Sequence, residues 1–162
     1  MTIDSPELKK LPGVLCTQCK EGQGCQIYET RPPVCRGWFC GWRVMPQLDD
    51  SWRPDISQIL VTLTGDDIPP SYKGPAVRID LLGPVQKILW PPLVNFIGGM
   101  LERRVPLFLS VPGAPGYVSA KVFLNEAMAI AHASRNLARV QQALLQAVEL
   151  CADHPAEKVE LD

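Results

Sequence analysis

The sequence predicts an α+β protein in which an irregular, cysteine-rich metal knuckle precedes a ββαββα domain with a long C-terminal helix. Two observations lead to this prediction. Five of the six cysteines fall in one short segment, and the later sequence contains four runs with strand-like alternation and two with helical spacing. Strands clustered in pairs, with helices between them, are typical of the α+β class.

We divide the chain into three parts on this basis. Residues 1–55 form the cysteine-rich metal-binding module and its connector, residues 56–152 the α+β scaffold, and residues 153–162 a polar tail. Within the first part, residues 1–13 are a polar lead-in. Connector residues 44–55 contain two prolines and a pair of adjacent aspartates, which is typical of an irregular segment.

The first pair of strands is predicted at residues 59–63 and 77–81. Aliphatic residues alternate with other residues in both runs, most clearly in the second, where Arg78 and Asp80 separate the apolar positions. Gly65 and the adjacent acidic pair Asp66-Asp67 end the first run, and we expect this pair to lie in a solvated turn.

The second pair of strands is predicted at residues 105–111 and 117–123. The intervening Pro-Gly-Ala-Pro-Gly at 112–116 is typical of a turn, so the two runs are expected to form a hairpin. Pro106 lies within the first of these runs and favours either an edge strand or the start of a strand, because proline cannot donate a ladder hydrogen bond. The pattern does not predict the order of the four strands.

Two helices complete the scaffold. Pro91 and Pro92 suit the first turn of a helix that runs to about Arg104. The last helix is predicted from an N-cap at Asn125 to about Ala152. Its residues at three- and four-residue spacing form one apolar stripe. The stripe consists of Leu137, Val140, Leu144, Val148 and Cys151.

Composition excludes several classes of protein. Sixteen basic and seventeen acidic residues give a net charge of −1, which leaves no general basic surface for nucleic acid. The most apolar stretch, residues 81–101, is interrupted by three prolines and a lysine, and this excludes a membrane-spanning helix. The N-terminus has no apolar segment typical of a secretory signal. We therefore expect a cytoplasmic protein, where clustered cysteines more often hold metal than form disulfides.

The cysteine-rich segment has the spacing C-x2-C-x5-C-x9-C-x4-C. Its thiols belong to Cys16, Cys19, Cys25, Cys35 and Cys40. Four thiolates suit Zn²⁺ or an iron–sulfur cluster equally, and soft sulfur ligands argue against Mg²⁺ or Ca²⁺. Residues 16–43 carry four basic and two acidic side chains, so their charge of +2 offsets the −2 of either centre.

Five thiols for four coordination positions leave one spare. We predict Cys16, Cys19, Cys25 and Cys35 as the metal ligands. Cys40 is the alternative fifth candidate, which either replaces Cys16 or Cys19 or remains a free reactive thiol. Structural disulfides among these cysteines are a further alternative.

The other chemically active residues receive structural interpretations. Cys151 is expected to be a small buried hydrophobe on the last helix. His132 and His154 have no neighbouring cysteines in the sequence and are expected at the surface or at helix ends.

The arginines and aromatic residues of the segment are also interpreted structurally. Arg31 and Arg36 are expected to donate hydrogen bonds within the module rather than to bind a substrate. Four aromatic residues are expected to form a small apolar core that shields the metal. They are Tyr28, Trp38, Phe39 and Trp42.

The segment GCQIYETRPPVCRGWFC resembles C-x-I-Y-x-x-R-P-x-x-C-R-x-[FY] of the YkgJ-like "CxxCxxxxCC" proteins, a group described as a zinc- or iron-chelating domain. The matching positions are Cys25, Ile27, Tyr28, Arg31, Pro32, Cys35 and Arg36, and Trp38 stands at the final aromatic position. The adjacent Cys-Cys pair of the group is missing. The resemblance covers about residues 14–43 and implies a divergent member that chelates zinc or iron.

The sequence thus predicts a small cytoplasmic protein with a four-cysteine site. The leading interpretation is structural Zn²⁺ that supports a surface for a partner protein, because a site with four protein ligands has no open coordination position. The first alternative is an iron–sulfur protein that acts in redox chemistry or protein modification. The second alternative is a disulfide-stapled binding module. Neither a membrane nor a nucleic acid is expected as a partner.

Overall fold

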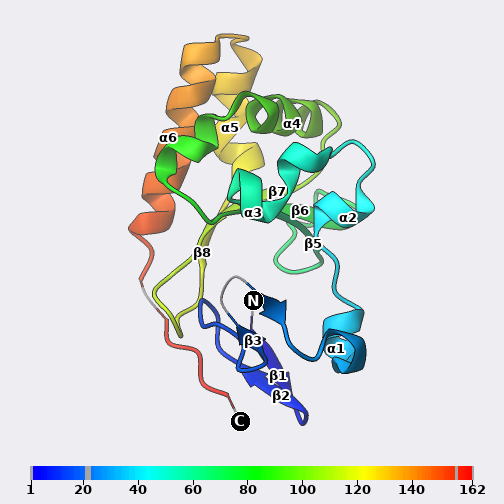
Figure 1. Ribbon diagram of the computed structural model, residues 1–162. Coiled ribbons are helices and arrows are strands. Elements are labelled where there is room, and N and C mark those ends of the chain that lie inside the picture. The colour runs from blue at the N-terminus through cyan, green and yellow to red at the C-terminus, as the bar shows by residue number, and fades with distance from the viewer. Residues whose placement is uncertain (1, 21–22, 156, 162) are drawn as a thin grey trace.

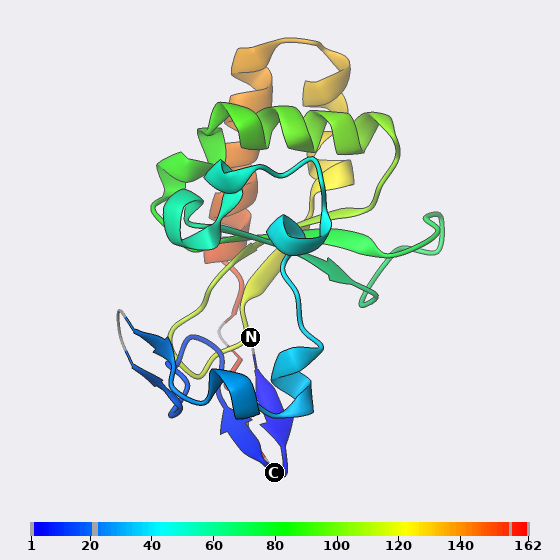
Figure 2. The same ribbon diagram turned by 45° about the vertical axis from the view of Figure 1, so that its right-hand side comes forward.

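The computed structural model describes residues 2–20, 23–155 and 157–161. Its centre is a four-stranded sheet with the order β5-β6-β7-β8. Figure 1 shows three helices, α4, α5 and α6, on one side of this sheet and the N-terminal segment with its small strands on the other. Figure 2 shows the same separation from a second direction, with the C-terminal end returning to the N-terminal segment.

The sheet is mixed because its two middle strands are parallel. Strands β5 (Ile59–Thr64) and β6 (Ala76–Leu81) pair antiparallel, as do β7 (Leu107–Val111) and β8 (Ala120–Phe123). Strands β6 and β7 pair parallel, with Val77 opposite Leu107. A parallel pair needs a crossover, and helix α4 (Pro91–Glu102) supplies it.

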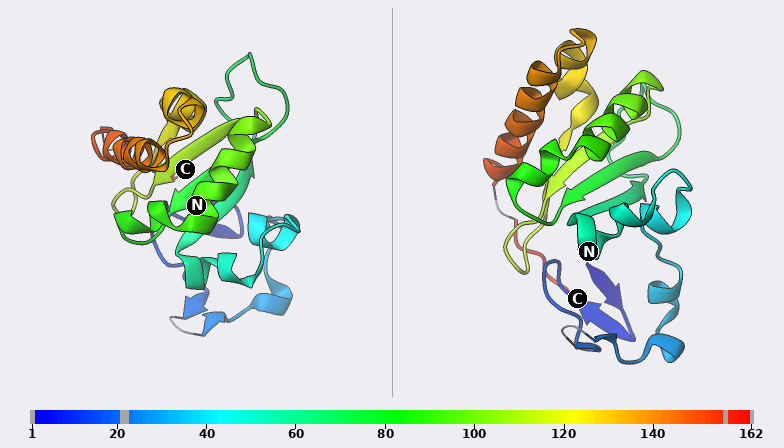
Figure 3. Two further views of the ribbon diagram at one scale, coloured as in Figure 1. Left: turned by 90° about the horizontal axis from the view of Figure 1, so that it is seen from above. Right: turned by 45° about the horizontal axis from the view of Figure 1, so that its top comes forward.

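One face of the sheet is apolar and carries the principal core. Alternation along the strands directs Ile59, Ile79 and Leu109 to this face, where each is fully buried. Helices α4, α5 (Leu124–Ala133) and α6 (Leu137–Ala152) cover it, as Figure 3 shows from above and from an oblique angle. Among the described residues, no helix is long and apolar enough to cross a lipid bilayer.

The segment before the sheet contains only short elements. Its two small antiparallel sheets are formed by β1 (Ile3–Ser5) with β2 (Leu8–Lys10), and by β3 (Cys19–Lys20) with β4 (Gly24–Cys25). Its helical turns are η1 (Tyr28–Thr30), α1 (Pro33–Arg36), α2 (Gly41–Val44), η2 (Asp50–Trp52) and α3 (Pro54–Ser57). One further turn, η3 (Val85–Leu89), precedes α4.

The predicted α+β class is confirmed, and all four predicted strands are present. Pro106 marks a strand start, since β7 begins at the next residue and the Pro106 carbonyl accepts a hydrogen bond from Val77 N at 2.9 Å. The alternative of an edge strand is wrong, because β7 lies between β6 and β8. The predicted polar lead-in is also wrong, because residues 3–10 form a hairpin that buries Ile3 and Leu8.

The predicted single long C-terminal helix is wrong. It is broken into α5 and α6 by residues 134–136, where Arg135 adopts a left-handed φ of 51°. Asn136 then caps α6, its side chain accepting from Arg139 N at 3.2 Å. The predicted N-cap, Asn125, lies inside the first turn of α5 instead and is buried there.

Asn125 joins α5 to the sheet. Its side-chain oxygen accepts a hydrogen bond from Leu107 N at 2.7 Å, and its side-chain nitrogen donates to Val105 O at 2.9 Å. The polar side chain therefore serves backbone groups at the start of β7 rather than those of its own helix.

The C-terminal tail pairs with the β7–β8 connection. Val118 N donates to Glu157 O at 2.8 Å, Val159 N donates to Gly116 O at 2.9 Å, and Tyr117 forms an isolated bridge with Lys158. The tail is therefore attached to the loop that was predicted to begin the fourth strand, which itself begins later, at Ala120.

Candidate metal centre

The five clustered cysteines line one pocket of about 460 Å³. Its wall contains Cys16, Cys19, Cys25, Cys35 and Cys40, together with Ile3, Lys10, Tyr28, Arg31, Trp38, Phe39 and Arg43. The sixth cysteine, Cys151, is buried in the principal core with its Sγ 3.7 Å from the Leu109 carbonyl. All six are free thiols. The five clustered cysteines therefore lie apart from Cys151. The prediction that Cys151 is a buried apolar residue is confirmed.

A turn and a short hairpin make Cys16, Cys19 and Cys25 neighbours through their backbones. Cys19 N donates to Cys16 O at 2.9 Å, which closes the Cys-Thr-Gln-Cys turn. Cys19 then lies directly opposite Cys25 in the β3–β4 ladder. Directly opposed residues of an antiparallel pair present neighbouring side chains on one face.

Cys35 and Cys40 reach the pocket from helical turns. Cys35 lies in α1, which begins at Pro33, a residue suited to the first helical position. Cys40 directly precedes α2 and is buried. Gly41, which follows, lies so close to β5 that an added Cβ would be 2.8 Å from a methyl carbon of Val61. Glycine at this position therefore lets the turn that carries Cys40 pack directly on the sheet.

The pocket combines thiols with cationic side chains. Desolvation and the neighbouring Cys16 and Cys25 thiols raise the pKa of the Cys19 thiol. Lys10, Arg31 and Arg43 line the same pocket and carry positive charge. The thiols therefore share their pocket with three cationic side chains.

Arg31 and Arg36 have the structural role that the sequence predicts. Arg31 Nη1 donates to Tyr28 O at 2.8 Å, and its guanidinium lies 3.7 Å from the centre of the Tyr28 ring. Arg36 Nε donates to Arg31 O at 2.8 Å. Together they brace residues 28–36, the stretch that carries Cys35.

The predicted apolar core of the module is wrong, although Tyr28, Trp38 and Phe39 do line the thiol pocket. Tyr28 and Phe39 are more than half exposed, and Trp38 is 41% exposed. Trp42 is partly buried, but it packs against the principal core. The module is too small to enclose its own aromatic residues, since burial rises with the amount of chain that surrounds a side chain.

The donor set suits a soft metal, but the sulfurs are not arranged around an ion. Within residues 2–20, 23–155 and 157–161, no group of three or more His, Cys, Asp or Glu side chains is placed so that it can hold a metal. The five thiols therefore share one pocket without forming a metal site among the described residues.

Sequence reasoning missed the contribution of the N-terminal hairpin to this pocket. Ile3 and Lys10, which pair with each other at its open end, both line the wall. The signal was Pro6-Glu7 between short runs that contain Ile3 and Leu8, which is turn chemistry flanked by apolar residues. His132 and His154 lie outside the pocket wall, half-buried and exposed respectively.

In comparisons with protein-family models, curated proteins and solved structures, nothing matches this chain. The resemblance to the YkgJ-like group therefore stays a prediction from the motif at residues 25–36.

Proposed function

We propose that this chain is a metal-binding protein whose N-terminal module holds Zn²⁺ through Cys16, Cys19, Cys25 and Cys35. One observation supports the proposal above all others. Every cysteine of the segment lines a single pocket, although the five are spread over three different local structures, whereas the sixth cysteine lies in a separate core. Cysteines placed only for packing would have no reason to share one cavity.

The proposed role of the metal is structural. Four thiolates on Zn²⁺ would leave no open coordination position, which is typical of structural sites. The module needs such support because few of its side chains are buried, and a segment of this size rarely builds a sufficient core. An iron–sulfur cluster uses the same four-thiolate donor set and remains the alternative, with redox chemistry or protein modification as its role.

A partner protein is the proposed use of the surface around the pocket. Leu15, Tyr28, Val34 and Phe39 are large apolar residues of the module that are each at least 41% exposed. Large apolar side chains that stay exposed are available for contact with a partner protein. In this proposal the metal fixes the loops that present them.

The fifth thiol needs its own assignment. Cys40 is buried beside α2, whereas the four proposed ligands are half-buried. It is therefore proposed as the spare thiol, and the alternative places it in the coordination shell instead of Cys16 or Cys19.

Anaerobic purification followed by metal analysis tests the proposal. We expect a colourless protein with one equivalent of zinc, which Co²⁺ can replace to give thiolate-to-cobalt charge-transfer absorption. The Cys19→Ser variant should lose the metal, and the matched Cys151→Ser variant should retain it. A brown protein with broad visible absorption would establish the iron–sulfur alternative, and a metal-free protein would contradict both.

Two further measurements separate the remaining alternatives. Cys40→Ser should retain one equivalent of zinc, and loss of metal in this variant would mean that Cys40 is a ligand. Alkylation and mass analysis without reductant should find every module thiol free of disulfide. The direct opposition of Cys19 and Cys25 makes this pair the first place where the disulfide-stapled alternative would show.

A further inference from the structure

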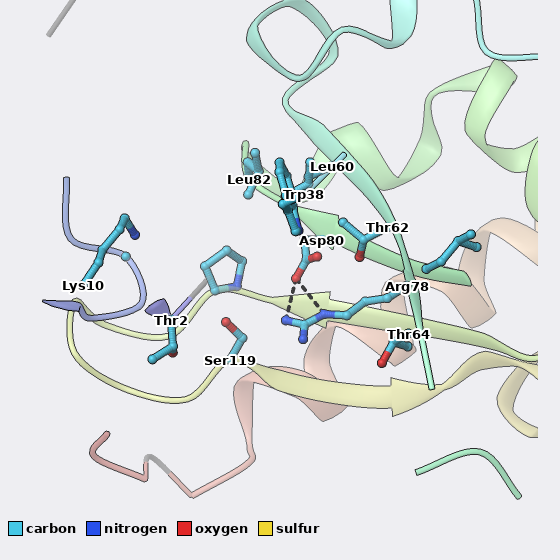
Figure 4. A pocket seen from close by; sticks show the side chains of 13 residues that line it. Thr2, Lys10, Trp38, Leu60, Thr62, Thr64, Arg78, Asp80, Leu82 and Ser119 are labelled. Atoms are coloured by element: carbon cyan, nitrogen blue, oxygen red, sulfur yellow. Dashed lines mark hydrogen bonds and ion pairs between the residues drawn. The ribbon is translucent and has the colours of Figure 1, made fainter. Parts of the chain in front are cut away.

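The second face of the sheet is polar at its centre. Strand β6 directs Arg78 and Asp80 to this face, away from the helices, with Thr62 of β5 opposite Arg78 and Ser110 of β7 opposite Asp80. Figure 4 shows the Arg78–Asp80 pair extending from the sheet into a pocket. A charged pair on the central strands is unusual, because buried charges are expensive and an apolar pair is often as stable.

The pocket lies between the sheet and the N-terminal segment and has a volume of about 480 Å³. Thr2, Lys10 and Trp38 reach it from the N-terminal side, and Ser119 reaches it from the β7–β8 connection. A cavity of this size suits a small organic ligand. Lys10 and Trp38 also line the cysteine pocket, so the two pockets share a wall.

The guanidinium of Arg78 is held in a fixed orientation. Its Nε and Nη2 donate to one Asp80 oxygen at 3.0 and 2.7 Å, and Nη2 also donates to Ser110 Oγ at 3.0 Å. Ser110 Oγ in turn donates to Ala120 O at 2.9 Å. Among the hydrogen bonds of the described chain, none involves Arg78 Nη1, and the side chain is 31% exposed. The two N–H donors of Arg78 Nη1 therefore remain available to a ligand.

Charge and shape define what such a ligand carries. The two donors of Arg78 Nη1 belong to a charged guanidinium and therefore suit an anionic acceptor such as a carboxylate. Trp38, Leu60 and Leu82 are the large apolar residues labelled on the pocket wall in Figure 4. An anionic group paired with Arg78 would thus leave the remainder of the ligand against an indole and two leucines.

We propose that this pocket binds a small monocarboxylate with a planar apolar body. The carboxylate accepts hydrogen bonds from Arg78, and the body lies against Trp38 and the neighbouring leucines. The site shares Lys10 and Trp38 with the wall of the cysteine pocket, but none of the thiols lines it.

Benzoate tests the proposal, with neutral benzamide as its matched control. In ¹⁵N spectra the chain has four tryptophan indole signals, and Trp38→Phe identifies the one of interest. Benzoate should shift the Trp38 signal with a Kd on the order of 1 mM, as expected for so few atoms. Benzamide should bind at least about tenfold more weakly than benzoate, because it lacks the negative charge.

Variants assign the binding to the pocket. Arg78→Met should abolish the benzoate shift, whereas Lys121→Met, which removes a cation of the same sheet face outside this pocket, should retain it. Because Arg78→Met leaves Asp80 unpaired and can unfold the chain, Ser119→Phe is the second variant. It adds bulk to the pocket wall while keeping both partners of the ion pair, and it should also abolish binding. The proposal is overturned by absent binding, by equal binding of benzamide, or by binding that persists in Ser119→Phe.

Discussion

The cysteine-rich module and the sheet with its helices differ in what holds them together. The principal core begins in the sequence at Leu48, and its fully buried members include Ile59, Ile79, Leu109 and Leu124. In the module, Cys40 is buried, but Leu15, Tyr28 and Phe39 are more than half exposed. Apolar burial therefore explains the stability of one region, because it is the main favourable term in folding. The cysteine-rich module needs a different source of stability.

The cysteines show the same contrast at the level of single residues. Cys151 is an apolar side chain within the core, whereas Cys16, Cys19, Cys25 and Cys35 are half-buried around an accessible pocket. One residue type thus occupies two settings in one chain, a buried core and the wall of an accessible pocket.

Removal of the proposed zinc ion should have the largest effect, and this effect should be confined to the module. Structural zinc contributes on the order of 10 kcal/mol in zinc-finger peptides, so a chelator should greatly accelerate amide exchange in residues 16–43. Exchange in β5 and β7 should stay slow, because the principal core does not include the thiols. Hydrogen exchange with and without the chelator measures this. Loss of amide protection across the whole chain would contradict the proposed difference between the module and the sheet. Unchanged protection in residues 16–43 would contradict it as well.

A core truncation should have the next largest effect. Leu109→Ala removes a fully buried side chain from β7 and should lower the free energy of unfolding by about 2–5 kcal/mol. Leu15→Ala removes the same atoms from the module, where the side chain is 61% exposed, and should change it by less than about 0.5 kcal/mol. Urea unfolding of both variants makes the comparison. Equal losses would mean that the module is as well packed as the sheet.

The two asparagines of the C-terminal helices provide a finer test. Asn125→Ala leaves the buried Leu107 N and the Val105 carbonyl without their side-chain partner and should cost about 1–3 kcal/mol. Asn136→Ala removes an exposed N-cap and should cost about 1 kcal/mol. Thermal unfolding of the two variants ranks them. A larger loss of stability in Asn136→Ala than in Asn125→Ala would mean that the N-cap of α6 contributes more than the hydrogen bonds that join α5 to the sheet.

The sequence predicted the fold best in segments where a regular hydrophobic pattern coincides with burial in the principal core. Strands β5 and β6 lie within one residue of the predicted ranges, because alternation and burial act together there. The break between α5 and α6 was missed because the hydrophobic spacing continues through it. Arg135 and Asn136 end and restart the helix by a local backbone change that the periodicity does not encode.

The candidate site was predictable in its residues but not in its surroundings. Cysteine spacing identified the five residues that share a pocket. Cysteines at such short intervals are typical of a common site, so their side chains are expected to lie close together. The contributions of Ile3 and Lys10 depend on a hairpin that folds back onto them. The Arg78–Asp80 pocket was missed because it forms only when the N-terminal segment and the second face of the sheet come together.

The smallest effect expected is a pH dependence that originates at Cys151. Burial raises the pKa of its thiol above the ordinary value of 9.0, so the folded state keeps this proton at a pH where the unfolded chain has lost it. The stability that Cys151 contributes is therefore fully present below pH 9.0 and declines as the pH rises through the folded-state pKa. In Cys151→Ala this decline is absent, so the stability difference between the two proteins should shrink between about pH 8 and pH 10. Urea midpoints of both proteins across this range measure it, since titrations elsewhere in the chain cancel in the difference. A constant difference would place Cys151 in a solvated setting and remove the distinction between it and the thiols of the module.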